Sequence, residues 1–350
     1  MRSVWRWKSG FAAALAALLF SACDPAPPPA PPTPAAPVVP DRFGGIAGVE
    51  VKFADLAEGR QVLGASDAWT AMTSSMQRAA LMGREPPAAT ADFLIWQSDN
   101  VRPWNEAQRT RWLAALARIA PEFERLRLPL PPKVLLVLTS GKESEFTPHT
   151  RANAVVLPVE FDQQQFTDVE VLAHELLHVA TRHRPDLATR LYATIGFSPC
   201  GDLLWPREWE PLRIADHDAP HHRHFIRLKL GGIKGRTVAL MPVVVATKPV
   251  LNRKAGDTIV SVMETRLLEV IPGLGGQPTR PVRAGGKLVW HEAEALPEYL
   301  AALGGNTDYS IHPEETIADN VMFLVSGRKV PKPALLKQIE AVFLAQPAKP

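Results

Sequence analysis

The chain has 350 residues, with 39 Lys and Arg against 36 Asp and Glu. This length is sufficient for one large domain or two small ones. Three basic and no acidic residues lie in residues 1–23, so the remainder carries 36 of each and a net charge of zero. Because that remainder contains no dense basic run, we expect no nucleic-acid binding.

The N-terminus has the features of a bacterial export signal. Three basic residues precede an apolar run, residues 11–20, which is too short to span a bilayer. The next residues, Leu19-Phe20-Ser21-Ala22-Cys23, resemble a bacterial lipobox, which implies cleavage before Cys23 and lipid attachment to it. Asp24 resembles the signal that retains lipoproteins in the inner membrane. We therefore expect a lipid anchor on the extracytoplasmic face of the cell envelope, favouring the inner membrane. The alternative is a secreted protein cleaved near Ala22.

A Pro- and Ala-rich segment, residues 24–40, follows the signal peptide (residues 1–23). Nine of the sixteen residues from Pro25 to Pro40 are Pro. Such a segment prefers extended polyproline II and cannot bury a core. At about 3.1 Å per residue it would hold a folded domain up to roughly 50 Å from the bilayer. We expect residues 41–350 to form that domain.

The first part of this domain, residues 41–130, is predicted to be largely helical. Helices are expected near 67–83 and 105–120, the second opened by Asn105 and closed before Pro121. Two strands are then expected, at Lys133–Thr139 and at 153–157.

The most specific motif is His174-Glu175-Leu176-Leu177-His178, an H-E-x-x-H pattern in an apolar, helix-patterned segment. Thr167-x-x-Glu170 is a capping box that would open this helix. His174 and His178 would lie one turn apart on one face, so both imidazoles can bind one Zn²⁺. Glu175 is placed to polarise a metal-bound water. The alternative is a core helix with two satisfied histidines, although burying these groups without partners is costly.

Beyond this motif the pattern changes from helices to strands and back. A helix near 186–195 precedes a histidine-rich run. We interpret that run as a surface loop, with a place at the active-site rim or a separate metal site as alternatives. It consists of His217, His221, His222 and His224. The further predicted elements are strands at Phe225–Leu230, Thr237–Val245 and Thr258–Val270, and helices at 296–303, 313–325 and 333–345.

A third metal ligand is expected from the helix at 313–325. Pro313 suits its first position, and two Glu residues suit the positive end of its dipole. Glu315 and Asp319 are four residues apart and share a face. This spacing suits one carboxylate that binds the metal and another that holds a ligand His by its free ring N–H.

H-E-x-x-H followed on a later helix by E-x-x-x-D resembles the gluzincin zinc metallopeptidases, and residues 306–320 look like bacterial zincin-like lipoproteins. The resemblance implies three zinc ligands, His174, His178 and Glu315, with Glu175 as general base and Asp319 orienting a ligand His. It also implies an α+β, zincin-like fold, in which the active-site helix and the glutamate helix pack under a small mixed sheet. The separation of His178 and Glu315 by 137 positions is far longer than in thermolysin-like enzymes.

Two further roles are expected on weaker grounds. Tyr309 is the best-placed donor to a developing oxyanion, with His312 as a second possibility, and Tyr309 is equally consistent with a packing role. In zincins, a strand at the chain position of Asn153, Ala154 and Val155 lies at a sheet edge and pairs with extended substrate. A plain core strand is the alternative here.

The expected function is therefore that of a membrane-tethered zinc metallopeptidase. This hydrolase would cleave peptide bonds in peptide or protein substrates outside the cytoplasm. The alternative is a non-catalytic lipoprotein that keeps a zincin scaffold for binding or assembly. The sequence contains no indication of an oligomeric state.

Overall fold

The computed structural model describes residues 39–345 except residue 47, residues 162–165 and residues 233–234. The expected signal peptide, the lipidation site Cys23 and nearly all of the tether lie outside these described residues. Within them, none of the helices combines the length and the apolar character needed to cross a bilayer.

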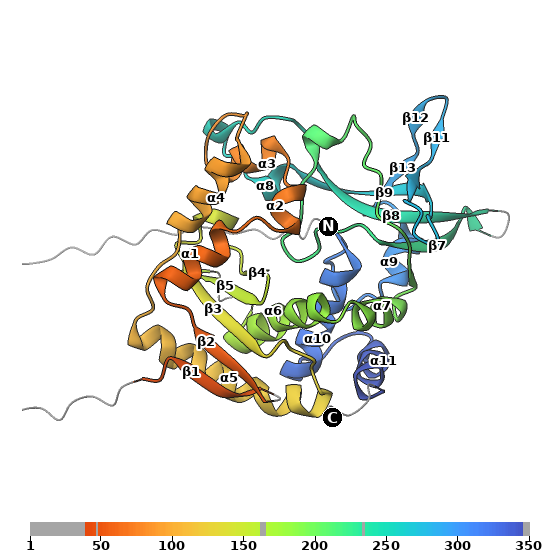
Figure 1. The fold of residues 1–350 in the computed structure, drawn as a ribbon. Coiled ribbons are helices and arrows are strands. Elements are labelled where there is room, and N and C mark those ends of the chain that lie inside the picture. Colours follow the sequence, from red (N-terminus) through yellow and green to blue (C-terminus); the bar gives the residue numbers. More distant parts are fainter. Residues whose placement is uncertain (1–38, 47, 162–165, 233–234, 346–350) are drawn as a thin grey trace, which may run out of the picture.

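A five-stranded mixed sheet forms one side of the molecule, in the order β1-β2-β3-β5-β4 (Figure 1). Its central strands β2, β3 and β5 are parallel, whereas β1 and β4 run antiparallel to their neighbours at the two edges. The sequence predictions did not include the β1-β2 hairpin. The strands are β1 (Arg42–Ile46), β2 (Val49–Phe53), β3 (Lys133–Thr139), β4 (His149–Arg151) and β5 (Ala154–Pro158).

The expected edge strand is an inner strand, so that prediction was wrong. Ala154 and Val155 pair with β3 on one side and with β4 on the other, and Asn153 donates to the carbonyl of Lys133 at 2.8 Å. The true edge is β4. A tight turn joins β4 to β5, with Ala152 at a φ of 51°. This turn contains no Gly to signal it, so β4 could not be recognised from the sequence.

Five helices lie between β2 and β3. The helix expected at 67–83 is two helices, because Ser74 begins a new one by accepting a hydrogen bond from Gln77 N. The helix expected to end before Pro121 instead runs on for more than a turn, since its buried face, which includes Phe123 and Leu126, stays in the core. The helices are α1 (Leu56–Gly64), α2 (Ala68–Met72), α3 (Ser75–Leu81), α4 (Thr90–Asp99) and α5 (Glu106–Leu126).

A second, antiparallel sheet is formed by β6 to β10 with β13, and its longest strands are β8 and β9. The strand expected at Thr258–Val270 begins as the short helix α8, because Thr258 and Ser261 form a capping box. The elements are β6 (Phe197–Pro199), β7 (His224–Leu230), β8 (Arg236–Ala246), α8 (Ile259–Val262), β9 (Met263–Ile271), β10 (Arg280–Pro281), β11 (Arg283–Ala284), β12 (Lys287–Leu288) and β13 (Trp290–Glu292).

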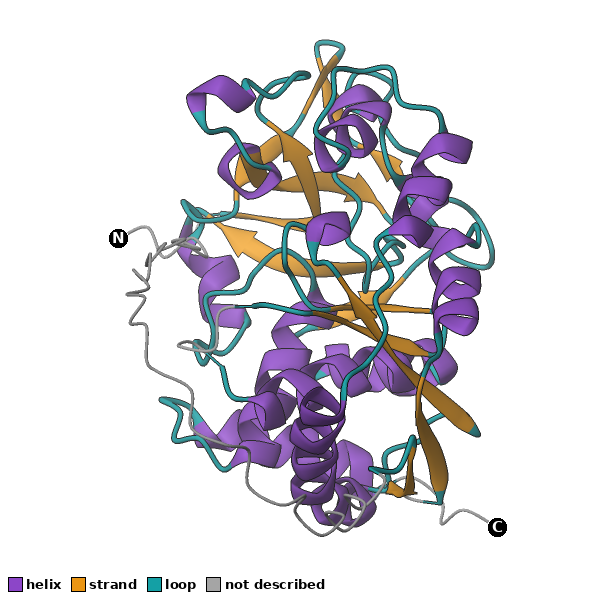
Figure 2. Ribbon diagram, turned by 90° about the vertical axis from the view of Figure 1, so that its left-hand side faces the viewer, coloured by secondary structure: helices purple, strands orange, loops and turns teal. Residues whose placement is uncertain are grey.

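The remaining helices follow β5 in the chain, and Figure 2 shows the helices of the molecule arranged around its strands. Helix α6 contacts α10, α5, β4 and β5. One apolar core joins α5, α6, α10 and α11 to the five-stranded sheet, which fixes α6 and α10 side by side (Figure 1). The predicted α+β class is confirmed. The helices are α6 (Asp168–His183), α7 (Pro185–Ala193), α9 (Pro297–Ala302), α10 (Pro313–Ser326) and α11 (Pro333–Leu344).

Candidate metal centre

Helix α6 carries the H-E-x-x-H motif and begins where the capping box predicts it. Thr167 accepts from Glu170 N, and the Glu170 side chain accepts from Thr167 N. The buried Leu172 and Leu176 fix one face of α6 in the core. The other side of the helix presents both motif histidines to α10.

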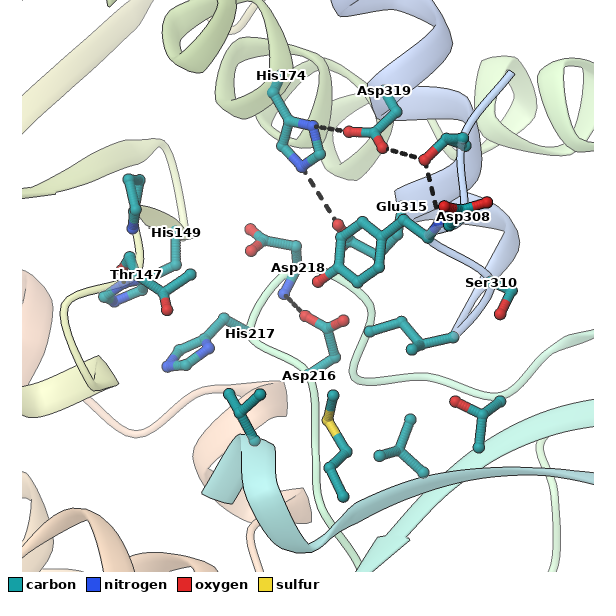
Figure 3. Close-up of a pocket in the computed structure, with 18 of the residues that line it drawn as sticks. Thr147, His149, His174, Asp216, His217, Asp218, Asp308, Ser310, Glu315 and Asp319 are labelled. Carbon is teal, nitrogen blue, oxygen red and sulfur yellow. Dashed lines mark hydrogen bonds and ion pairs between the residues drawn. The ribbon is translucent and has the colours of Figure 1, made fainter. Parts of the chain in front are cut away.

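His174, His178 and Glu315 lie together although the chain separates them widely. His174 Nε2 is 3.2 Å from Glu315 Oε2, and His178 Nε2 is 3.6 Å from Glu315 Oε1. One ligand atom from each residue lies within 4.8 Å of the others. The structure therefore brings together the three residues that the sequence predicted as metal ligands (Figure 3 labels His174 and Glu315).

Asp319 lies one turn beyond Glu315 and reaches the same histidine. Its Oδ1 is 3.1 Å from His174 Nδ1, and its Oδ2 accepts from Thr307 Oγ1. This is the position from which a carboxylate orients a ligand His and fixes its tautomer.

Glu314 has a position that the sequence analysis missed. Its Oε1 lies 2.8 Å from His178 Nδ1 and accepts from Thr181 Oγ1, while Tyr192 donates to its Oε2. Only 2% of Glu314 is exposed. Each of the two histidines thus has its own buried carboxylate on α10. The adjacent pair Glu314-Glu315 was the signal in the sequence for this second carboxylate. Neighbouring residues on a helix point about 100° apart, so the two side chains can face different partners.

Glu175 points into the same space. Only 4% of it is exposed, and its Oε2 is buried without a hydrogen-bond partner among the described residues. Burial and the nearby negative charge of Asp218 raise the pKa of Glu175 to about 8. A carboxyl group with a raised pKa in a cavity suits proton transfer near neutral pH.

The loop that contains the histidine-rich run contributes two aspartates rather than histidines. Asp218 lies with Glu175 and His178 in one group of possible ligand atoms, and with Asp216 and Glu315 in another. Burial and the charge of Glu315 raise the pKa of Asp216 well above its ordinary value. The sequence analysis did not predict a role for either aspartate, because the neighbouring histidines are the more usual signal of a metal site.

The histidines of that run have different surroundings. His217 lines the cavity and stacks on Trp69 with ring centroids 3.9 Å apart, which agrees with the alternative of a place at the active-site rim (Figure 3). His221 is exposed, as expected of a surface loop, whereas His222 is buried against Trp205. Burial lowers the pKa of His222 to about 4, and that of His217 well below its usual value.

The site opens into a cavity of about 720 Å³, and Tyr309 is one of the residues that line it. Burial and the charge of Glu315 raise the pKa of the Tyr309 phenol, which keeps its proton for donation. His312, the second oxyanion candidate, instead caps α10, where its Nδ1 accepts from Glu314 N at 3.1 Å. Of the two, Tyr309 alone lines this cavity.

A divalent cation fits the buried atoms that remain without partners. His178 Nε2 and Glu315 Oε1 are buried and lack hydrogen bonds within the described chain. Although burial opposes it, hydrogen bonds to Asp319 and Glu315 raise the pKa of His174 well above normal. The charges of Glu315 and Asp218 likewise outweigh burial and raise the pKa of His178 to about 10. These acidic surroundings favour a positive charge at the centre of the group, and two imidazoles with a carboxylate are ligands that zinc prefers.

Comparison with protein-family models, with curated proteins and with solved structures finds no match to this chain.

Proposed function

We propose that this chain is a zinc-dependent metallopeptidase of gluzincin type, tethered outside the cytoplasm by a lipid on Cys23. The observation that carries the proposal is the convergence of His174, His178 and Glu315 from two packed helices. The mixed sheet with an antiparallel edge strand above α6 is compatible with the zincin-like fold that the motifs imply.

His174, His178 and Glu315 would hold the metal, with Asp319 and Glu314 orienting the two imidazoles. Zinc bound there would supply Lewis-acid activation of water and of the substrate carbonyl. Glu175 Oε2 would accept the proton of the attacking water and pass it to the leaving amine. The Tyr309 hydroxyl would donate to the oxygen that gains charge.

The first test is metal content and peptide cleavage by the full-length protein purified in detergent, beside Glu175→Gln. Zinc should bind both proteins stoichiometrically, because Glu175 is not a ligand. Cleavage of a peptide library should fall by about 10²- to 10⁴-fold in the variant, the usual contribution of a general base. Glu315→Ala should lower the zinc content, and full zinc in that variant would contradict the ligand assignment.

The second candidate is a non-catalytic protein that keeps the zincin scaffold for binding or assembly. Glu175 argues against it, because its buried Oε2 has no hydrogen-bond partner among the described residues and a binding protein does not need such a costly buried carboxylate. Stoichiometric zinc without cleavage of any peptide in the library would favour this alternative.

A further inference from the structure

Hydrogen bonds hold the loop of residues 213–218 in place at the wall of the cavity. Ile214 N donates to Val244 O at 3.1 Å. Ala215 exchanges two hydrogen bonds with the Gln77 side chain, and Trp69 Nε1 also donates to Ala215 O. These bonds fix the position of the loop immediately before Asp216 and Asp218, which both lie in the site (Figure 3).

Asp218 covers the sheet edge at β4, whose three residues are buried. Its Oδ1 accepts from Thr150 N at 2.9 Å and from Thr150 Oγ1. Thr150 lies on the edge strand β4, so this N–H is the donor that an added strand would use. An extended peptide that approaches β4 past Thr147 and Pro148, which line the cavity, therefore cannot pair with β4 at Thr150 and would end beside Asp218.

Where such a peptide would end, carboxylate oxygens converge. One oxygen each of Asp216, Asp218 and Glu315 lies within 4.8 Å of the others. Three oxygens within that limit lie no more than about 2.8 Å from a common centre, which is within reach of charged N···O hydrogen bonds. Asp216 Oδ2 is buried without a partner in the described chain, and Glu175 Oε2, on a side chain only 4% exposed, has none either.

The arrangement of these acidic groups also suits a cation. Asp216, Asp218, Glu175 and Glu315 place four carboxyl groups around this point. Arg182 lies 3.6 Å from Asp218, whereas Asp216 Oδ2 and Glu175 Oε2 have no partner among the described residues. The outer part of the cavity adds more acidic residues, which are Glu145, Glu264, Glu292, Glu294 and Asp308.

We propose that Asp216 and Asp218 bind the free α-ammonium group of the substrate, so that the enzyme removes residues from peptide N-termini. This inference rests on the proposed peptidase function and names its substrate class. The short distance from the ammonium group to the reacting carbonyl supports this substrate class, because an α-nitrogen lies only about 2.5 Å from the carbonyl carbon of its own residue. The charged group of a Lys or Arg side chain is at the end of a long aliphatic chain and would lie deeper in the cavity.

The test measures binding, so it does not depend on turnover. Zinc-loaded full-length protein is titrated with leucine hydroxamate and with N-acetyl-leucine hydroxamate, in which an acetyl group removes the charge on the α-nitrogen. The free amine should bind about 10- to 100-fold more tightly, the contribution of charged hydrogen bonds. Asp216→Asn should remove this preference while leaving the affinity for the acetylated probe unchanged. Asp92→Asn, an exposed carboxylate on α4, is the matched control.

Equal affinities in the wild-type protein, or tighter binding of the acetylated probe, would overturn the inference and leave the metal centre standing. The inference would also be overturned if the wild-type protein bound a second metal ion that Asp216→Asn did not bind, because the two aspartates would then hold a metal. Protein that takes up no zinc would instead contradict the proposed function, and the inference would fall with it.

Discussion

Glu314 and Glu315 are neighbours with different surroundings. Glu315 faces the cavity with His174 and His178, whereas Glu314 faces His178 Nδ1, Thr181 and Tyr192. The geometry gives Glu314 a positioning role, in which it would hold His178 so that Nε2 points to the metal. A ligand histidine without such a partner binds metal more weakly, because its ring orientation and tautomer are no longer fixed.

Glu314→Gln should therefore lower zinc affinity by about 10- to 100-fold while leaving the zinc ligands in place. A neutral amide cannot offer His178 and Tyr192 the negative acceptor that the carboxylate provides. Competition with a fluorescent chelator measures the affinity, and Glu298→Gln in the first turn of α9 serves as control. An unchanged zinc affinity in a folded Glu314→Gln protein would show that Glu314 only packs.

At the scale of elements, the edge strand β4 is buried by the loop that crosses it. His149 on β4 is 1% exposed, lies 4.2 Å from the His217 ring and has its Nδ1 3.1 Å from Thr147 O. Burial lowers the pKa of His149 to about 4. The positive charge of Arg151 lowers this pKa further, whereas the negative charges of Asp218 and of Asp67, which pairs with Arg151, raise it.

This buried histidine should make the fold acid-sensitive. Because the folded-state pKa lies below the unfolded value of 6.5, the unfolded chain binds more protons between pH 4 and 6.5. The contribution to stability is complete above pH 6.5 and is lost as the pH falls. In His149→Asn, the difference in unfolding free energy between pH 7 and pH 5 should shrink by about 2 kcal/mol.

Urea unfolding of the metal-free protein at the two pH values measures this difference. His183→Asn removes an exposed histidine from the end of α6 and should leave the difference unchanged. An equal effect of both substitutions would argue that His149 is not buried in a neutral form.

At the scale of the whole molecule, the folded part and the expected anchor are separate in sequence. The first strand begins at Arg42, and none of the described helices can act as a membrane span. In the proposed function, the lipid at Cys23 would attach the protein to the membrane, and the Pro-rich tether would follow it.

Cys23→Ser should move the protein from the membrane fraction to the soluble extracytoplasmic fraction, because the residue that would carry the lipid is lost. Zinc content and cleavage of soluble peptides should stay within about twofold of wild type, since the residues that could hold the metal and those that line the cavity all follow residue 76. Immunoblotting of fractionated cells gives the location. Cys200→Ser is the matched control, and continued membrane attachment of Cys23→Ser would exclude the lipoprotein assignment.

The features that the sequence alone determined are those that local spacing specifies. The capping box at Thr167 places the start of α6, and a period of 3.6 residues sets His174 beside His178 and Glu315 beside Asp319. Lys133–Thr139 was predicted with its observed bounds because its apolar, β-branched run is typical of a buried strand.

Only the tertiary structure decided which distant groups meet. Glu314 reaches His178 across 136 residues, and Asp218 reaches Thr150 across 68. No local period encodes such contacts, because they depend on how whole elements pack. The order of strands in a sheet is equally non-local, and for this reason β4 rather than β5 became the edge. The sequence therefore specified the motif residues, while packing supplied the carboxylates that orient them and close the cavity beside them.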